Sequence, residues 1–191
     1  KNSAMGGGAI SIRSNCSAEL NGTHLTGNFV SGYEEKNNGK NDGDGEGGGA
    51  IYVGFGTVPL TNVTASGNTA SSFGGVIDAY KGTVIIDGGT YQNNSAGNGG
   101  VVYAQNNSKV TVTGAKLIGN ESTHDHGDSV NNNYGGGAIN TVGGSLTLSG
   151  VTLDQNKTTY YGGAILANGT QVTISNTNKG KKPLVKVFIF L

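Results

Sequence analysis

The stretch GGVIDAYKGTVIIDGGTYQNNSAGN (residues 74–98) contains one complete copy of the repeat that decides the fold. It opens with two glycines and two apolar residues, and a Tyr-x-x-Asn segment (91–94) follows near its end. Tetrapeptides like GGVI occur six times, at residues 7–10, 48–51, 74–77, 99–102, 136–139 and 162–165. Repetition at such a period is typical of solenoid and other repeat architectures.

A second repeated signal, an apolar residue three positions before an asparagine, sets the length of the unit. It occurs at the pairs Leu25/Asn28, Ala65/Asn68, Tyr91/Asn94, Leu117/Asn120 and Leu153/Asn156. Successive pairs are 40, 26, 26 and 36 residues apart, so the unit has 26 residues and two units carry insertions of 14 and 10. Both insertions fall between the Asn and the next Gly-Gly, at about residues 33–47 and 122–135.

Aligned on the second signal, the other apolar residues form rows. Seven positions before it stand Ala18, Val58, Val84, Val110, Leu146 and Val172. Five positions before it stand Leu20, Leu60, Ile86, Val112, Leu148 and Ile174, and a Gly or Asn follows two residues later in every unit. Apolar and polar residues alternate with the period of two that is typical of strands. We therefore expect three short strands per unit, one beginning at Gly-Gly and two flanking the Gly/Asn turn.

Such a unit cannot bury its own apolar side, but stacked units can. The sequence therefore predicts an all-β fold, a parallel β-helix of about six coils of roughly 26 residues over residues 1–178. Ile51, Ile77, Val102 and Ile139 should point inward. The Asn row should lie at corners, where side-chain amides can hydrogen-bond from coil to coil.

Composition excludes several other classes. The chain has 36 glycines among 191 residues but only 2 prolines and no Gly-X-Y period, so it is not collagen-like. Lys and Arg number 12, as do Asp and Glu, and the zero net charge argues against a nucleic-acid or anionic membrane partner. The single cysteine, Cys16, allows no intrachain disulfide.

The two ends of the chain differ from the repeat. The sequence begins at Lys1 without a signal-peptide pattern, and we interpret it as a piece of a longer protein. Residues 179–191 (KGKKPLVKVFIFL) change abruptly from Gly/Asn/Thr-rich to basic and then apolar. This tail is consistent with a last strand, a cap over the core or the end of a fragment, and it is too short for a membrane-spanning helix.

The pairing of GGA[ILV] with FxxN-like tetrapeptides resembles the repeats of the chlamydial polymorphic outer membrane proteins and related adhesin-like autotransporter passengers. GGAI is matched at 7–10, 48–51, 136–139 and 162–165, whereas Tyr91 is the only aromatic residue at the start of the second tetrapeptide. The resemblance implies a right-handed β-helix, displayed at the cell surface or outer membrane or secreted. It also implies a non-catalytic adhesive or structural role, a receptor or glycan partner on a host or neighbouring cell, and membrane attachment only through a separate anchor domain.

Parity along the first strand of each unit predicts which residues point outward. Tyr52, Asp78, Tyr80, Tyr103 and Gln105 should form one contiguous exposed face over coils two to four. Exposed tyrosines with polar neighbours can stack on sugar rings, so we consider this face a candidate glycan-binding site. The alternative is that tyrosine stands there only as a good strand former.

The insertions contain candidate metal ligands. Asp42, Asp44 and Glu46 alternate with glycines in the first, a pattern that can wrap Ca²⁺, although the EF-hand pattern is not met. His124, Asp125, His126 and Asp128 in the second are possible transition-metal ligands. In both cases a solvated loop without a metal is the alternative.

Two functional hypotheses remain, a non-catalytic surface adhesin and a carbohydrate-active β-helix that is either an enzyme or a binding module. Glycoside hydrolysis needs two carboxylates about 5–10 Å apart, and the predicted face offers only Asp78. Arg13 and Lys81 are the only cations near that face for a lyase acting on acidic sugars. A phage or viral fibre segment would share the architecture, but no residue singles it out.

Overall fold

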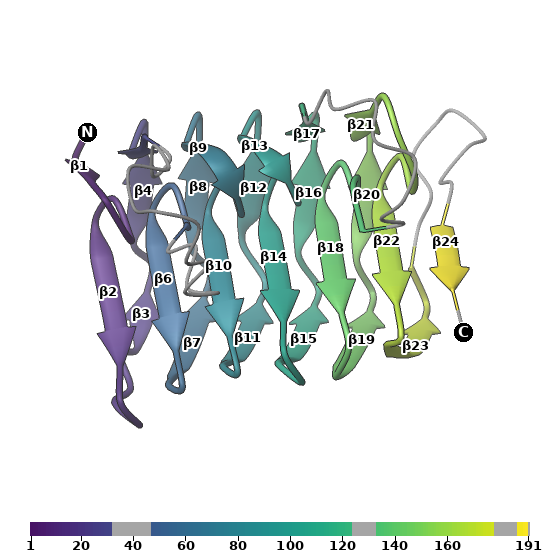
Figure 1. Cartoon of the computed structure of the whole chain (residues 1–191), viewed down its shortest axis with the longest axis horizontal. Helices are drawn as coiled ribbons and strands as arrows, with labels where there is room; N and C mark the ends of the chain where they lie inside the picture. The colour runs from purple at the N-terminus through teal and green to yellow at the C-terminus, as the bar shows by residue number, and fades with distance from the viewer. Residues whose placement is uncertain (32–46, 124–132, 178–186, 191) are drawn as a thin grey trace, which may run out of the picture.

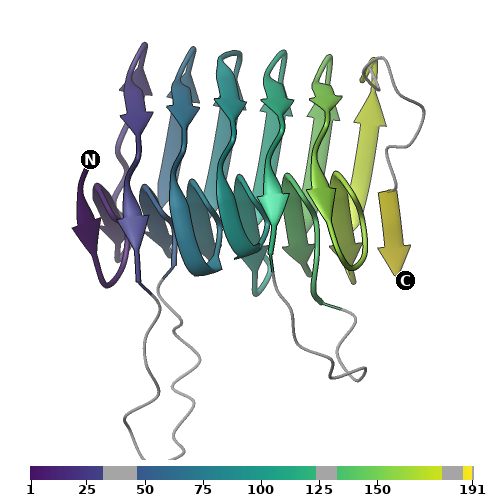
Figure 2. The same ribbon diagram turned by 90° about the horizontal axis from the view of Figure 1, so that it is seen from above.

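The computed structural model describes residues 1–31, 47–123, 133–177 and 187–190 as an all-β solenoid, and no helix occurs among them. The strands form four parallel sheets, which we name A to D, and each complete coil contributes one strand to every sheet in the order B, C, D, A. Figure 1 shows the coils stacked side by side along the long axis, and Figure 2 shows from above that the chain ends lie at opposite ends of the stack. The predicted parallel β-helix of about six coils is confirmed.

The sheets are composed as follows. Sheet A contains β1 (Ser3–Ala4), β5 (Phe29–Val30), β9 (Thr69–Phe73), β13 (Ser95–Asn98), β17 (Glu121–Ser122) and β21 (Lys157–Thr158). Sheet B contains β2 (Ile10–Arg13), β6 (Ile51–Gly54), β10 (Ile77–Tyr80), β14 (Val102–Gln105), β18 (Ile139–Val142), β22 (Ile165–Asn168) and β24 (Val187–Phe190). Sheet C contains β3 (Leu20–Asn21), β7 (Thr57–Thr61), β11 (Thr83–Asp87), β15 (Lys109–Thr113), β19 (Ser145–Ser149) and β23 (Gln171–Ser175). Sheet D contains β4 (His24–Thr26), β8 (Thr64–Ser66), β12 (Thr90–Gln92), β16 (Lys116–Ile118) and β20 (Thr152–Asp154).

The register stacks the predicted apolar rows directly on one another. In sheet B, Ile77 pairs with Ile51 on one side and Val102 on the other. In sheet C, Val84 pairs with Val58 and Val110 in the same way. These side chains are buried and belong to one continuous apolar core along the stack. The predicted inward positions are therefore confirmed, and the apolar burial that no coil achieves alone is shared between neighbours.

The two glycines of the tetrapeptide meet two different structural requirements in the first five copies, as residues 74 and 75 show. Gly74 adopts a φ of 56°, a left-handed conformation that glycine reaches without the steric cost of a Cβ. Gly75 lies so close to the next coil that a Cβ would sit 2.2 Å from the carbonyl oxygen of Gly100. The first glycine therefore makes the turn from sheet A to sheet B, and the second permits the coil spacing.

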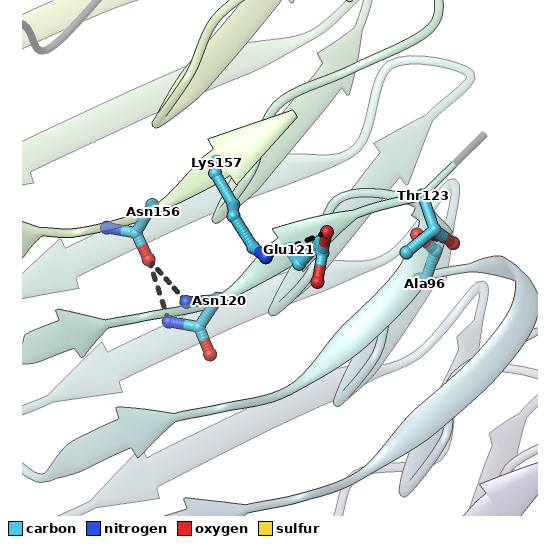
Figure 3. Close-up of polar contacts among 6 residues, drawn as sticks. All are labelled: Ala96, Asn120, Glu121, Thr123, Asn156 and Lys157. Carbon is cyan, nitrogen blue, oxygen red and sulfur yellow. Dashed lines mark hydrogen bonds and ion pairs between the residues drawn. The ribbon is translucent and has the colours of Figure 1, made fainter. Parts of the chain in front are cut away.

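The predicted Asn row forms a buried ladder at the corner between sheets D and A. In each rung, the backbone N–H and the Nδ2 group of one Asn donate to the Oδ1 of the Asn in the next coil, as from Asn68 to Asn94 at 2.9 Å for both bonds. Figure 3 shows the last rung, from Asn120 to Asn156. Asn2 adds an earlier rung that the sequence analysis missed, since it donates to Asn28 in the same way. Asn2 could have been predicted from the sequence, because it lies one repeat length of 26 residues before Asn28.

Two details differ from the sequence-based expectations, and the tail follows one of the alternatives given for it, a last strand. Each complete coil has four strands rather than three, because the short segment after each Asn also pairs, in sheet A. The inward row fails in the last coil, where Ile174 is 42% exposed on the edge strand β23 of sheet C. The apolar end of the tail forms β24, which pairs in parallel with β22, so it adds a last strand to sheet B.

Candidate functional site

The outer side of sheet B is the face on which the sequence analysis placed a binding site. Tyr52, Asp78 and Tyr103 stand in register with one another on successive strands, at the positions that alternate with the inward row. They are 4%, 0% and 6% exposed, so the expected open face is wrong at these three positions. Tyr80 and Gln105, at the far end of β10 and β14, are partly exposed. Parity predicts the side of the sheet correctly, but it says nothing about what packs over that side.

Side chains and chain segments of neighbouring coils cover this outer row. The ring of Phe73, at the end of β9, stacks on Tyr103 with centroids 4.4 Å apart and planes at 15°. The ring of Tyr52 lies along its own strand, close enough that a Cβ on Gly54 would be 2.8 Å from its Cε1. The guanidinium of Arg13, one coil earlier, lies 4.9 Å from the Tyr52 ring centroid. The absence of a side chain at Gly54 therefore leaves the room in which the Tyr52 ring lies flat.

Asp78 holds the end of the first insertion. Its Oδ2 accepts a hydrogen bond of 2.9 Å from the backbone N–H of Gly47, the first described residue after the gap at 32–46. Gly48 N–H in turn donates to the carbonyl of Phe73 at 2.8 Å. The carboxylate that the sequence analysis treated as a ligand-binding group is thus a buried acceptor for the returning chain.

The second insertion is held at both of its ends. On the entering side, Ser122 Oγ donates to the carbonyl of Gly97 at 2.6 Å. The next residue, Thr123, donates from Oγ1 to the carbonyl of Ala96 at 3.1 Å, and Figure 3 draws these two residues side by side. On the returning side, Asn140 Nδ2 donates to the carbonyls of Asn133 at 2.8 Å and Gly135 at 3.3 Å.

The Gly135 N–H completes this arrangement by donating to Asn98 Oδ1 at 3.1 Å. Asn98 and Asn140 are both buried. Buried polar side chains of the solenoid therefore fix where the second insertion leaves and rejoins it, because an amide without its partner would be costly there.

The environment of Tyr103 changes its acid–base behaviour. Burial raises the pKa of its phenol, and the negative charges of Asp78 and of ionised Tyr134 raise that pKa further. The phenol therefore remains neutral at physiological pH.

A second cluster lies at the corner between sheets B and C, and we call it the aromatic corner. It consists of Phe55, Tyr80 and Lys81. Phe55 is 50% exposed, and its ring meets Tyr80 edge-on, with centroids 5.6 Å apart and planes at 64°. The sequence analysis missed Phe55. The signal was in the sequence, because Phe55 directly follows β6 at a position where later coils have the polar residues Lys81 and Asn106.

The candidate metal ligands all belong to the two insertions. Asp42, Asp44, Glu46, His124, Asp125, His126 and Asp128 lie outside the described residues, so the Ca²⁺ and transition-metal hypotheses stay predictions. Within residues 1–31, 47–123, 133–177 and 187–190, no three His, Cys, Asp or Glu side chains gather in a way that could hold a metal ion. The same part of the chain has no helix long and apolar enough to cross a bilayer.

Four in-register parallel sheets with a repeated coil define the class of protein: a parallel β-helix repeat protein. The chain matches no protein-family model, no curated protein and no solved structure at a significant level.

Proposed function

We propose that this chain is a non-catalytic β-helical passenger, displayed at the cell surface or outer membrane or secreted, that presents its two insertions for adhesion. The partner is a receptor or glycan on a host or neighbouring cell. The observation that carries the proposal is the set of buried side chains at the bases of the insertions, above all Asn98 and Asn140 on the second. Buried polar side chains fix the ends of the insertions on the solenoid. This arrangement suits loops that bind a partner, since long loops on rigid scaffolds often form binding sites.

The rest of the solenoid supports the same role. Both insertions connect sheet A to sheet B, between β5 and β6 and between β17 and β18, so they leave the same edge of the stack. The Asn ladder and the continuous core link all coils between these two points. The two insertions therefore share one support with a fixed spacing, which suits simultaneous contact with one large partner.

The test is retention of cells on beads that carry the whole chain. We expect beads with the wild-type chain to retain epithelial or bacterial cells above beads that carry an unrelated protein. Asn140→Ala should lower retention because the second insertion loses its fixed end, while Thr147→Ala on the outer side of β19 should not. Circular dichroism establishes that both variants are folded. Failure of the wild-type beads to retain any cell type above background would overturn the proposal.

A carbohydrate-active β-helix is the second candidate, and the exposed aromatic corner is the observation that favours it. Asp78 has no exposed surface, which favours a binding module over an enzyme. Glycan-array binding that Tyr80→Ala abolishes would support the binding module. Release of product from polysaccharides, lost in Asp78→Ala but retained in Asp78→Asn, would instead indicate that Asp78 supports catalysis by holding Gly47.

A further inference from the structure

The backbone of Phe55 is unusual for its residue type. Its φ is 57°, in the left-handed region that Gly and Asn enter most readily. The same position in other coils also has positive φ, but there it holds Ser14, Lys81 and Asn106. A bulky aromatic residue in this conformation is unfavourable for folding, and such outliers cluster at binding sites. Phe55 is also 50% exposed, so burial offsets little of that cost.

The neighbours of Phe55 give its exposed ring a defined chemistry. Lys81 Nζ lies over both rings, 5.3 Å from the Phe55 centroid and 5.5 Å from the Tyr80 centroid, and so makes a cation–π contact with each of them. Gln105 pairs in register with Tyr80 one coil further along and brings a side-chain amide to the same edge. An apolar ring face, a positive charge and an amide therefore lie together on the surface.

We propose that the aromatic corner binds an acidic saccharide. The apolar face of a sugar ring stacks on Phe55, the Lys81 ammonium pairs with a carboxylate or sulfate of the sugar, and Gln105 and the Tyr80 hydroxyl bond to its hydroxyl groups. This inference rests on the proposed function in one respect, because it names the chemical class of a surface partner. It adds a site on the solenoid itself, at the corner between sheets B and C rather than at the insertions.

Single-stranded nucleic acid is the competing occupant, because bases also stack on aromatic rings next to cations. Binding of that kind depends on a positively charged groove that follows many phosphates, whereas this chain has a net charge of zero. One ammonium beside two rings fits a single charged sugar better than a polyanionic backbone.

The experiment uses an array of uronic-acid, sialylated and sulfated glycans with their neutral counterparts, probed with the whole chain. We expect binding to acidic glycans, and Phe55→Asn should weaken the affinity for the best of them about tenfold. Because Asn accepts positive φ, the same substitution should leave the melting temperature unchanged or raise it. Lys81→Gln should abolish the preference for acidic over neutral glycans. Phe29→Asn, which removes another exposed phenylalanine from sheet A, is the matched control and should bind as the wild type does.

Several results would overturn the inference. One is binding to no acidic glycan, and another is unchanged affinity in Phe55→Asn. A clearly lower melting temperature in that variant would mean that Phe55 is there for packing, and tighter binding to a single-stranded oligonucleotide than to any glycan would assign the site to nucleic acid. The outcome is separable from the adhesion test, since wild-type beads that retain cells without acidic-glycan binding contradict only this inference. Glycan binding without cell retention contradicts only the proposed function.

Discussion

Removing one buried rung of the Asn ladder tests whether the ladder stabilises the coil stack. In Asn94→Ala, the backbone N–H and the Nδ2 group of Asn68 both lose their acceptor, Asn94 Oδ1. The bond from Asn94 Nδ2 to the carbonyl of Ala65 is lost as well. Both donors are buried, and a buried donor left without an acceptor costs about 1 to 3 kcal/mol. The free energy of unfolding should therefore fall by about 4 kcal/mol.

Asn156→Ala is the matched control, because Asn156 Oδ1 accepts the same pair of bonds from Asn120. Asn156 is only partly buried, so water can replace it and the expected loss is about 1 kcal/mol. Urea denaturation followed by circular dichroism measures both losses, and an unchanged slope establishes that the unfolding transition remains comparable. Equal losses in the two variants, or a loss below about 1 kcal/mol in Asn94→Ala, would refute the view that buried amide pairing stabilises the stack.

Three further predictions concern single positions. Gly75→Ala should prevent folding because its Cβ would meet the next coil. Gly67→Asn should lower the free energy of unfolding by less than about 1 kcal/mol, because Gly67 has a φ of 61° and open space around it. Thermal melts distinguish the two variants. Ile174→Thr should lower the free energy of unfolding by less than about 1 kcal/mol in the same urea assay, because Ile174 is already 42% exposed. The pKa values of Tyr91 and Tyr103 are raised, chiefly by burial, so absorbance at alkaline pH should show these two phenols ionising only on unfolding. Since the raised pKa values favour the neutral phenols of the folded state, stability should be constant below about pH 10 and fall as the pH rises above it.

Most of the scaffold could be predicted from the sequence, because the inward apolar residues, the turn glycines and the ladder asparagines each recur at one position of the repeat unit. Val84 and Val110 could be paired by counting residues alone, and the structure pairs them so. The fourth strand was missed because it is short, only two residues in β17 (Glu121–Ser122), and therefore too short to show an apolar alternation. Ile174 was wrongly expected to be buried because the row was extended to β23, which is an edge strand of sheet C.

The candidate site was less predictable because it depends on residues that break the repeat. Nothing in the sequence of β14 indicates that Phe73, at the end of a longer strand β9, stacks on Tyr103. Likewise, the bond from Gly47 to Asp78 joins a residue before β6 to the strand of the following coil. For Phe55, the sequence shows an aromatic residue in the turn after β6. It does not show the positive φ of Phe55 or the contact of its ring with Tyr80, which only the structure shows.

Exposure of the outer row of sheet B depends on whether a segment of the same coil or of a neighbouring coil packs over it. Ser11 on β2 follows a short connection from β1, and it is exposed. Asn140 on β18 follows the second insertion, and it is buried against the returning segment. That segment also reaches the next coil, because Asn168 Nδ2 donates to Asn133 Oδ1. A returning insertion thus covers and links two coils, so a change in either insertion should alter the stability of the solenoid as well as its binding.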